Sequence, residues 1–581
     1  MPNFFTDNED LCWQFARLDL DEVIRLREGD FVEHKIFPYA PTSVADARDS
    51  YRRVLELVGD LAANFIAPRA EEVDRNGPTL SDGRVTYAKG TQEAMKALAG
   101  ADLMGFTLPR RFGGLNFPTS AYVVAIELVA RADAALMTLF GLQDIAETIN
   151  DFGSEDQRQR YLPRFASGEV TGAMVLTEPD AGSDLQAVRL KATEDPDHPG
   201  KWRLNGVKRF ITNGCGEVLL VLARSEPGTT DGRGLSLFLC ERDPSVRVVR
   251  LEDKLGIHGS PTCQLQFTNT PAELVGQRRR GLTQYVMALM NGARVAIAAQ
   301  GLGIAEAAYR AALAYAVERE QFGKAIVDMP PVTDMLLNMK IGIETSRSLL
   351  YDTARVVDLY QGLERRLEHL KRDDPAYART RERATSLRRL ANILTPMSKY
   401  QCCEMAVRVT SDAIQVLGGS GFMRDYPLER YFRDARITNI YEGTSQLQVV
   451  AILAGLHGGA LKERFAEFAA MEFTGDLAPL AEQVHAAHRC FDQALAVIQE
   501  KKSRDYDALV GRNLADLACD VYCGYLLLDQ AREKEEKKLL AQRFIPLMAL
   551  RAEQNLHVVL CGNDIPIRAG RQLLAPDVPK A

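Results

Sequence analysis

The chain has 581 residues, of which 46% are hydrophobic and 26% are charged, and its formal net charge is −7. This composition is ordinary for a globular protein with a large core, and the length predicts about three to five domains. The acidic balance argues against nonspecific binding to nucleic acid. No apolar run reaches the ~18 residues that a membrane span requires, and the acidic N-terminus lacks the basic and apolar regions of a targeting signal. We therefore expect a cytoplasmic protein without a membrane span.

The ten cysteines are scattered along the chain, and none forms a Cys-x-x-Cys motif. Two pairs, Cys519 with Cys523 and His485 with His488, are spaced about one helical turn apart, but both lie in amphipathic helical patterns. This arrangement favours reduced thiols without a disulfide framework, and no metal site is expected.

Residues 1–170 have the pattern of an α-helical domain. Apolar residues recur at three-and-four spacing over residues 51–66 and 121–149, which predicts amphipathic helices. Between these stretches, residues 109–114 contain a proline and paired glycines and predict a turn.

The pattern changes over residues 171–280, where short apolar segments alternate with turn signals. The segments are residues 201–207, 218–223 and 235–239. Two dipeptides typical of tight turns, Asn205-Gly206 and Asp231-Gly232, separate them. This combination predicts a compact antiparallel β-domain.

Helical periodicity returns over residues 281–456, with long helices predicted over residues 293–317 and 335–360. The highly charged residues 364–389 predict a solvated helical hairpin rather than a binding patch.

Gly458-Gly459 has the composition of a linker, and residues 457–581 continue with amphipathic helices. The expected fold is therefore α+β and multidomain: a helical N-terminal domain, a central antiparallel β-domain, a helical-bundle domain and an additional C-terminal helical domain.

One carboxylate, Glu442, lies between the aromatic Tyr441 and the small Gly443, and donors follow it at Thr444 and Gln446. An acid among apolar neighbours tends to have a raised pKa, which suits a general base near neutral pH. Glycine lets the backbone approach a ligand closely. The same segment can also be a helix N-terminus with an acid near the positive end of the helix dipole, and both interpretations stay open at this point.

Two segments of the predicted β-domain have a second possible role. In residues 174–184, a strand is stopped by Glu178-Pro179, and the loop that follows, with Gly182 and its hydroxyls, is either a plain turn or a cradle for a flat heterocycle or a phosphate. In residues 208–214, Phe210 and Thr212 share one face of a strand, where they either pack in the core or flank a ring.

Two segments of the predicted helical bundle are similarly ambiguous. Residues 319–324 (Arg-Glu-Gln-Phe-Gly-Lys) end a long helix and match an ordinary helix cap. Residues 415–422 contain a glycine cluster that can host a pyrophosphate, although a lone cluster of this kind is a weak signal.

The order and spacing of all five segments resemble the acyl-CoA dehydrogenase family over about residues 90–455. The resemblance implies FAD held between the three domains and a homo-oligomer. On one subunit, the flavin-lining residues would be Met174, Leu176, Thr177, Gly182, Ser183, Phe210, Ile211 and Thr212, with Thr444 and Gln446 beside the diphosphate and adenosine part. Residues that would reach the FAD of a neighbouring subunit are Arg319, Gln321, Phe322, Gln415, Gly418 and Gly419.

On the substrate side, the resemblance implies Glu442 as the catalytic base, because the alternative base position of the family is the unreactive Ala293 here. Residues implied in acyl-CoA binding are Ser183, Asn291, Arg294, Tyr441 and Gly443.

The chain departs from the common family pattern in three ways. Phe210 stands where many members have tryptophan, Met329-Pro330-Pro331 replaces a glutamine-bearing segment, and the chain continues for roughly 125 residues beyond the common core. The extension, Met290-Asn291 and residues 254–263 resemble a longer bacterial branch that includes 3-methylmercaptopropionyl-CoA and broad-range fatty acyl-CoA dehydrogenases. Because extra helices in such members cover the surface used for tetramers, a homodimer is expected.

The implied reaction is α,β-dehydrogenation of an acyl-CoA thioester to the trans-2-enoyl-CoA. Glu442 would take the α-proton, and the β-hydrogen would leave as hydride to flavin N5, with electron-transfer flavoprotein as the expected electron acceptor. An acyl-CoA oxidase, which uses O₂, is the nearest alternative, and a DNA-associated flavoprotein of the same fold is disfavoured by the acidic balance. The acyl group itself cannot be read from residue identities.

Overall fold

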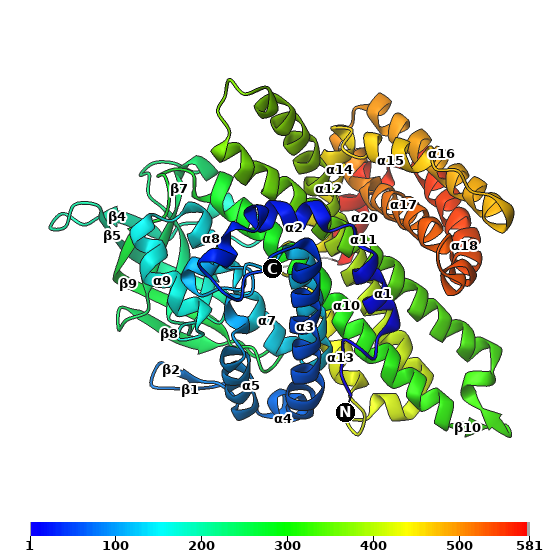
Figure 1. The fold of residues 1–581 in the computed structure, drawn as a ribbon, viewed down its shortest axis with the longest axis horizontal. Coiled ribbons are helices and arrows are strands. Elements are labelled where there is room, and N and C mark those ends of the chain that lie inside the picture. Colours follow the sequence, from blue (N-terminus) through cyan, green and yellow to red (C-terminus); the bar gives the residue numbers. More distant parts are fainter. Residues whose placement is uncertain (1, 578–581) are drawn as a thin grey trace.

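The computed structural model describes residues 2–577, and the chain up to Ala166 is built of helices apart from one small hairpin (Figure 1). The helices are α1 (Glu9–Arg17), α2 (Asp21–Arg27), α3 (Val44–Leu61), α4 (Ala70–Asn76), α5 (Lys89–Gly100), α6 (Thr119–Ala132), α7 (Ala134–Gly141), α8 (Asp144–Phe152) and α9 (Glu155–Ala166). The hairpin pairs β1 (Thr79–Ser81) with β2 (Arg84–Thr86).

The helix predicted over residues 121–149 is divided into α6, α7 and α8. The first break is at Asp133, whose backbone is extended and whose carboxylate accepts hydrogen bonds from the N–H groups of Ala135 and Leu136, capping α7. The second break makes Asp144 the first residue of α8. The apolar spacing continues through both breaks, so periodicity alone indicated one helix.

A seven-stranded sheet follows, on the left of Figure 1. Its strands are β3 (Gly172–Val175), β4 (Lys191–Glu194), β5 (Lys201–Thr212), β6 (Val218–Arg224), β7 (Leu235–Glu241), β8 (Val246–Leu251) and β9 (Thr262–Leu274). The pairings from β6 through β7, β9, β5 and β4 return to β6, so the sheet closes on itself. The predicted fold class is confirmed, but two pairings, β3 with β6 and β4 with β6, are parallel rather than antiparallel.

The turn predicted at Asn205-Gly206 is wrong, because this dipeptide lies inside β5. The register between β5 and β9 shifts at this point, because Asn205 faces both Thr268 and Asn269 of β9, and Gly206 has a φ of 144°. The dipeptide therefore lies inside one long strand, opposite a bulge in β9. The turn predicted at Asp231-Gly232 is confirmed, since these residues connect β6 to β7.

The helical bundle and the C-terminal helices form the rest of the chain. The bundle consists of α10 (Met287–Glu318), α11 (Pro330–His369), α12 (Pro375–Leu417), α13 (Leu428–Thr438) and α14 (Ser445–His457). The C-terminal helices are α15 (Lys462–Ala469), α16 (Ala478–Lys501), α17 (Arg504–Ala531), α18 (Glu535–Leu560), α19 (Ile565–Arg568) and α20 (Gly570–Leu574). They pack on α11, α12 and α14 through a second apolar core, on the right of Figure 1.

Two predicted connections in the bundle have the expected form. The charged residues 364–389 are the end of α11, a turn and the start of α12, which is the predicted helical hairpin. α10 ends at Glu318, as expected for residues 319–324, and a short ribbon follows in which β10 (Glu320–Gln321) pairs with β11 (Lys324–Ala325). In Figure 1 this ribbon lies at the lower right, far from the sheet.

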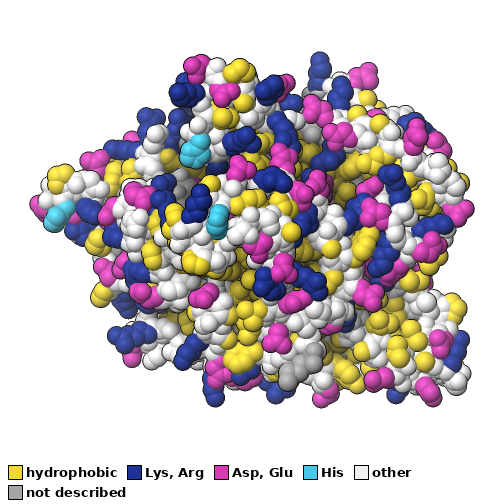
Figure 2. Space-filling model, viewed as in Figure 1, with side chains coloured by type: hydrophobic (Ala, Val, Ile, Leu, Met, Phe, Trp, Pro, Cys, Tyr) yellow, Lys and Arg dark blue, Asp and Glu magenta, His cyan; other side chains and the backbone are white. Residues whose placement is uncertain are grey.

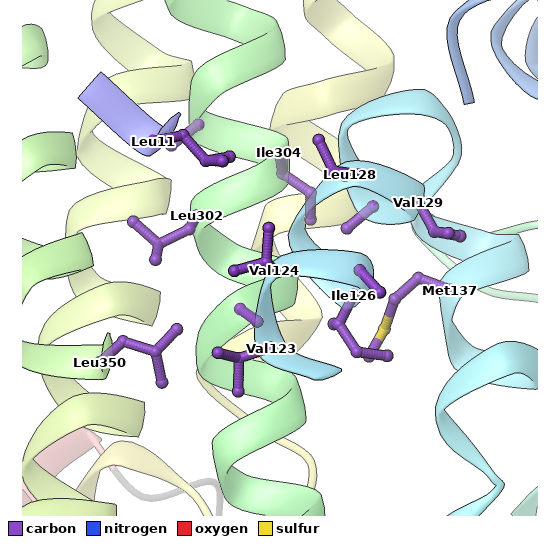
Figure 3. Close-up of a cluster of buried hydrophobic side chains, with 14 of the residues drawn as sticks. Leu11, Val123, Val124, Ile126, Leu128, Val129, Met137, Leu302, Ile304 and Leu350 are labelled. Atoms are coloured by element: carbon purple, nitrogen blue, oxygen red, sulfur yellow. The ribbon is translucent and has the colours of Figure 1, made fainter. Parts of the chain in front are cut away.

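The main apolar core joins the N-terminal helices to the bundle (Figure 3). Val124 of α6 points toward Leu302 of α10 and Leu350 of α11, and all three side chains are buried. This packing fixes α6 and α7 beside α10 and so sets the position of the N-terminal helices relative to the start of α10.

A buried arginine, Arg347 of α11, is surrounded by three carboxylates from separate helices. Its guanidinium donates to Glu127 Oε1 of α6 at 2.6 and 3.0 Å, to Glu306 Oε2 of α10 at 2.8 Å and to Asp10 Oδ2 of α1 at 2.5 Å. A planar guanidinium with five donors can satisfy several carboxylates at once.

Lys537 of α18 extends this cluster to the C-terminal helices. Its fully buried ammonium pairs with Asp10 and, at 2.5 Å, with Glu344 Oε2 of α11. Burial would raise the pKa of Asp10, but the charges of Arg347 and Lys537 outweigh burial and lower it to about 2.

The surface carries both signs of charge. On the face in Figure 2, Lys and Arg side chains are interspersed with Asp and Glu, without an extended basic area. Within residues 2–577, no helix combines the length and apolar character needed to cross a bilayer.

Candidate active site

A cavity of 580 Å³ lies where the N-terminal helices, the sheet and the bundle meet. Its walls are mainly apolar and come from α7, α8, the end of β3, the end of β5, residues 252–257, α10 and the segment between α13 and α14. Many of the residues expected at the site line this cavity: Met174, Leu176, Thr177, Gly182, Ser183, Phe210, Ile211, Thr212, Tyr441, Glu442, Gly443 and Thr444, together with Ala293.

Glu442 reaches the cavity from a tight turn between α13 and α14. Glu442 and Gly443 have φ angles of 54° and 89°, so two successive residues adopt the left-handed region, which is unfavourable for glutamate. A Cβ at Gly443 would also lie 2.8 Å from Gln448 Nε2. α14 begins directly afterwards with Thr444 as its N-cap, so the helix-start interpretation of this motif is correct, and it coexists with a carboxylate at the cavity.

Two side chains that the sequence did not single out hold this turn. Lys399 of α12 donates from Nζ to the Gly443 carbonyl at 2.8 Å. Gln448 of α14 donates from Nε2 to the same carbonyl at 2.9 Å and to the Glu442 carbonyl at 3.2 Å. Both side chains are fully buried, and a lysine or glutamine within a helical pattern carries no signal of such a contact.

Burial raises the pKa of Glu442, and the positive charges of Lys399 and Arg294 act in the opposite direction. Within residues 2–577, the Glu442 carboxylate has no hydrogen-bond partner, nor does its N–H group. Arg294 is itself buried in α10, donates to Asn291 Oδ1 at 3.1 Å, and keeps an Nε that has no partner among the described residues. The turn therefore presents an unbonded carboxylate beside a partly unsatisfied guanidinium.

Tyr441 ties the turn to two other elements. Its hydroxyl hydrogen-bonds to Gln300 Oε1 of α10, and Gln300 Nε2 donates to the Ala134 carbonyl of α7 at 2.9 Å. Gln300 is fully buried, so this chain of contacts keeps the Glu442 turn, α10 and α7 in fixed register.

Lys208, which is fully buried in β5, stabilises the part of the sheet that lines the cavity. Its Nζ donates to the Leu176 carbonyl at 2.7 Å and pairs with Glu178 Oε1 at 3.0 Å, and burial lowers the pKa of Lys208 to about 8. In front of it, Phe210 has a φ of 61° and a side chain that is 52% exposed toward the cavity.

The remaining expected residues do not line the cavity. Asn291 and Arg294 lie beside it on α10, whereas Gln446 is exposed in the first turn of α14. The residues assigned to a neighbouring subunit are exposed at the end of α10, on the ribbon or at the end of α12, and do not line the cavity: Arg319, Gln321, Phe322, Gln415, Gly418 and Gly419. Phe322, at 95% exposure, has almost no contact with its own chain.

Family models now identify the chain along most of its length. Models of the N-terminal, middle and C-terminal domains of acyl-CoA dehydrogenases match residues 48–169, 173–270 and 279–457, and a model described as acyl-CoA dehydrogenase C terminal matches residues 458–545.

The chain is similar to an acyl-CoA dehydrogenase of Bacillus subtilis, with 34% identity over 70% of this chain and 97% of the relative. It is also 34% identical to a 3-methylmercaptopropionyl-CoA dehydrogenase of Ruegeria pomeroyi, over 73% and 74% of the two chains. A solved acyl-CoA dehydrogenase of Bacillus anthracis, complexed with FAD, shares the fold with a TM-score of 0.75, covering 88% of each chain at 23% identity.

The fold and the relatives define an oxidoreductase that acts on CH–CH bonds. The chain belongs to the acyl-CoA dehydrogenase family, whose members depend on FAD.

The cavity has features of its own that suit FAD. Phe210 lines the cavity and is 52% exposed, with the Arg209 guanidinium over its ring at 4.6 Å from the centroid. Apart from Gly182 itself and its two chain neighbours, no described heavy atom lies within 4 Å of the point where a Cβ on Gly182 would stand, which leaves room beside the sheet for a flat ring system. Thr177, Ser183 and Thr444 supply hydroxyls at the same cavity.

Proposed function

We propose that the protein dehydrogenates an acyl-CoA thioester to the trans-2-enoyl-CoA, with Glu442 as the base that removes the α-proton. The observation that carries this proposal is the Glu442 carboxylate itself: it faces the cavity from a strained turn, its pKa is raised by burial, and it has no hydrogen-bond partner within residues 2–577. A base with these properties keeps its lone pairs for the substrate.

The backbone of the same residue supports a second role. The Glu442 N–H has no acceptor among the described residues, so it can donate to the thioester carbonyl, where negative charge develops as the α-proton leaves. Lys399 and Gln448 hold the turn in advance and so reduce the reorganisation needed to place both the base and the donor. FAD, when bound, supplies the two-electron acceptor.

For the CoA part of the substrate we propose Asn291, Arg294 and Ser183, with Tyr441 and Gly443 beside the thioester. Arg294 carries a buried Nε without a partner in the described chain, which is costly unless a ligand meets it. The apolar walls from α7, α8 and α10 suit the acyl group.

We further propose a homodimer and electron-transfer flavoprotein as the electron acceptor. The exposure of Phe322 and of the glycines Gly418 and Gly419 supports a role toward a second copy, because these groups have little function on an isolated subunit. Sedimentation velocity on the purified holoprotein tests the assembly, with a single species at twice the chain mass expected.

The reaction is tested by anaerobic titration of the FAD-loaded protein with acyl-CoAs that are short, long, branched, aromatic or sulfur-containing. Bleaching of the flavin band by at least one of them, with the enoyl-CoA as product, is the expected result; no bleaching by any of them would overturn the proposal. Reoxidation in air with release of peroxide would instead assign the chain as an acyl-CoA oxidase.

A further inference from the structure

A second carboxylate, Asp144, lines the cavity that contains Glu442. As the first residue of α8, it is 7% exposed and lies among apolar cavity residues such as Leu142 and Ile145. The proposed reaction with Glu442 as the base assigns no role to Asp144.

The carboxylate of Asp144 has no hydrogen-bond or ion-pair partner within residues 2–577. Its main-chain carbonyl accepts a hydrogen bond from the Thr148 hydroxyl at 2.9 Å, which does not involve the carboxylate. The α10 wall opposite is the glycine Gly292, where a Cβ would lie 3.7 Å from Asp144 Oδ2, so that wall offers no side chain to the carboxylate.

Two other carboxylates that are equally buried are paired. Asp358 accepts from the N–H groups of Thr119 and Ser120 at 2.7 and 2.8 Å and from the Ser120 hydroxyl at 2.6 Å. Glu127 binds Arg347 and the Tyr351 hydroxyl. Since buried polar groups in folded proteins normally have partners, the unpaired Asp144 indicates a partner that is not part of the chain.

We propose that Asp144 is a specificity residue that selects acyl groups carrying a hydroxyl or another O–H or N–H donor over plain alkyl chains of the same size. This inference rests on the proposed acyl-CoA dehydrogenation. The carboxyl group would accept the donor of the acyl substituent, while an alkyl chain would leave it buried and unpaired, and sites built for a polar group discriminate strongly against analogues that lack it.

The electrostatics of the cavity agree with this assignment. Burial raises the pKa of Asp144, and the charges of Glu147 and Glu442 raise it further. In its neutral form the carboxyl group both donates and accepts, which matches a hydroxyl substituent, and it adds no second negative charge beside the base.

The test compares FAD-loaded wild type with Asp144→Leu and Asp144→Asn. The substrates are hydroxyacyl-CoAs with the hydroxyl at carbon 4, 5 or 6 and the alkyl acyl-CoAs of equal heavy-atom count, and the readout is kcat/KM for flavin bleaching. Asp151→Asn is the matched control, because Asp151 is an exposed carboxylate of the same helix that does not line the cavity.

Wild type is expected to prefer at least one hydroxyacyl-CoA over its alkyl partner by about 10-fold or more. Asp144→Leu should lose or invert this ratio while keeping FAD and alkyl turnover, Asp144→Asn should keep part of it, and the Asp151→Asn control should leave it unchanged. An unchanged ratio in Asp144→Leu, including one that results from equal losses on both substrates, would overturn this inference and leave the proposed function intact. Absence of bleaching by every acyl-CoA in wild type would overturn the proposed function and, with it, this inference.

Discussion

Lys399 Nζ donates to the Gly443 carbonyl at 2.8 Å, and through this one contact a helix of the bundle holds the turn on which Glu442 stands. Lysine is strongly hydrated in water, so its complete burial here requires compensation, which the carbonyl and the nearby Glu442 charge provide. The relationship links the geometry of the turn to the pKa of the proposed base.

Replacing Glu442 by glutamine should remove the base while keeping the shape of the side chain. We expect Glu442→Gln to retain FAD and to bind acyl-CoA, yet to lose about 10²- to 10⁴-fold in the rate of flavin bleaching. Stopped-flow absorbance under anaerobic conditions measures the rate, and spectral perturbation of the flavin measures binding. Wild-type bleaching rates in the variant would show that another group takes the proton.

Replacing Lys399 by methionine should act on both geometry and charge. Without the hydrogen bond the turn loosens, and we expect kcat to fall about 10- to 100-fold. Because the ammonium lowers the pKa of Glu442, its removal raises that pKa, so the acidic limb of the kcat/KM profile moves to higher pH. The exposed Lys462→Met is the control. A limb that stays in place would mean that Lys399 does not influence the base.

Asp434 makes stability depend on pH. It is buried in α13 and accepts from the Ile257 N–H at 2.5 Å, yet burial raises its pKa from 3.8 to about 7. The folded protein therefore binds this proton more tightly than the unfolded chain, so Asp434 makes stability fall as pH rises between those values, by at most about 1.4 kcal/mol per pH unit.

Asp434→Asn keeps an acceptor for Ile257 and removes the titration. The difference in Tm between the variant and wild type should therefore grow in favour of the variant from pH 5 to pH 7, and level off above pH 7. Differential scanning fluorimetry across this range measures it, with the exposed Asp425→Asn as the control. A constant difference at all pH values would contradict the assignment.

Lys537→Met should destabilise the junction between the C-terminal helices and the rest of the chain. The substitution removes the buried cation that Asp10 and Glu344 share, and leaves Asp10 with Arg347 and Glu344 with Lys340. Breaking a buried pair from one side costs up to about 3–5 kcal/mol, and the remaining partners should keep the loss at or below the lower end of that range. Thermal unfolding measures the loss, and the neighbouring Lys538→Met, which breaks only surface pairs, should cost less than about 1 kcal/mol. Adding Glu344→Gln to Lys537→Met should restore part of the loss; no restoration would argue against the charge mechanism.

The fold class could be predicted because long periodic segments and clustered turn signals dominate the pattern. Asn205-Gly206 failed as a turn since the same dipeptide also fits inside a strand opposite a bulge, and only pairing with β9 decides between the two. The parallel pairings of β3 and β4 with β6 depend on long-range topology, which no local signal encodes.

The sequence could predict those cavity-lining residues that belong to a distinctive local segment, such as Glu442. Lys399, Gln448 and Asp144 were missed for a common physical reason. Each sits in a helical pattern, where a polar residue normally faces water, and only tertiary packing turns it toward the cavity or its supporting turn.

The charge cluster around Arg347 also imposes an order on assembly during synthesis. Asp10 is made near the start of the chain and can meet Arg347 once α11 exists, but its second counter-charge, Lys537, is translated more than 500 residues after it. Until α18 leaves the ribosome, Asp10 and Glu344 lack their shared cation. The packing of the first helix is therefore completed by one of the last helices to be synthesised.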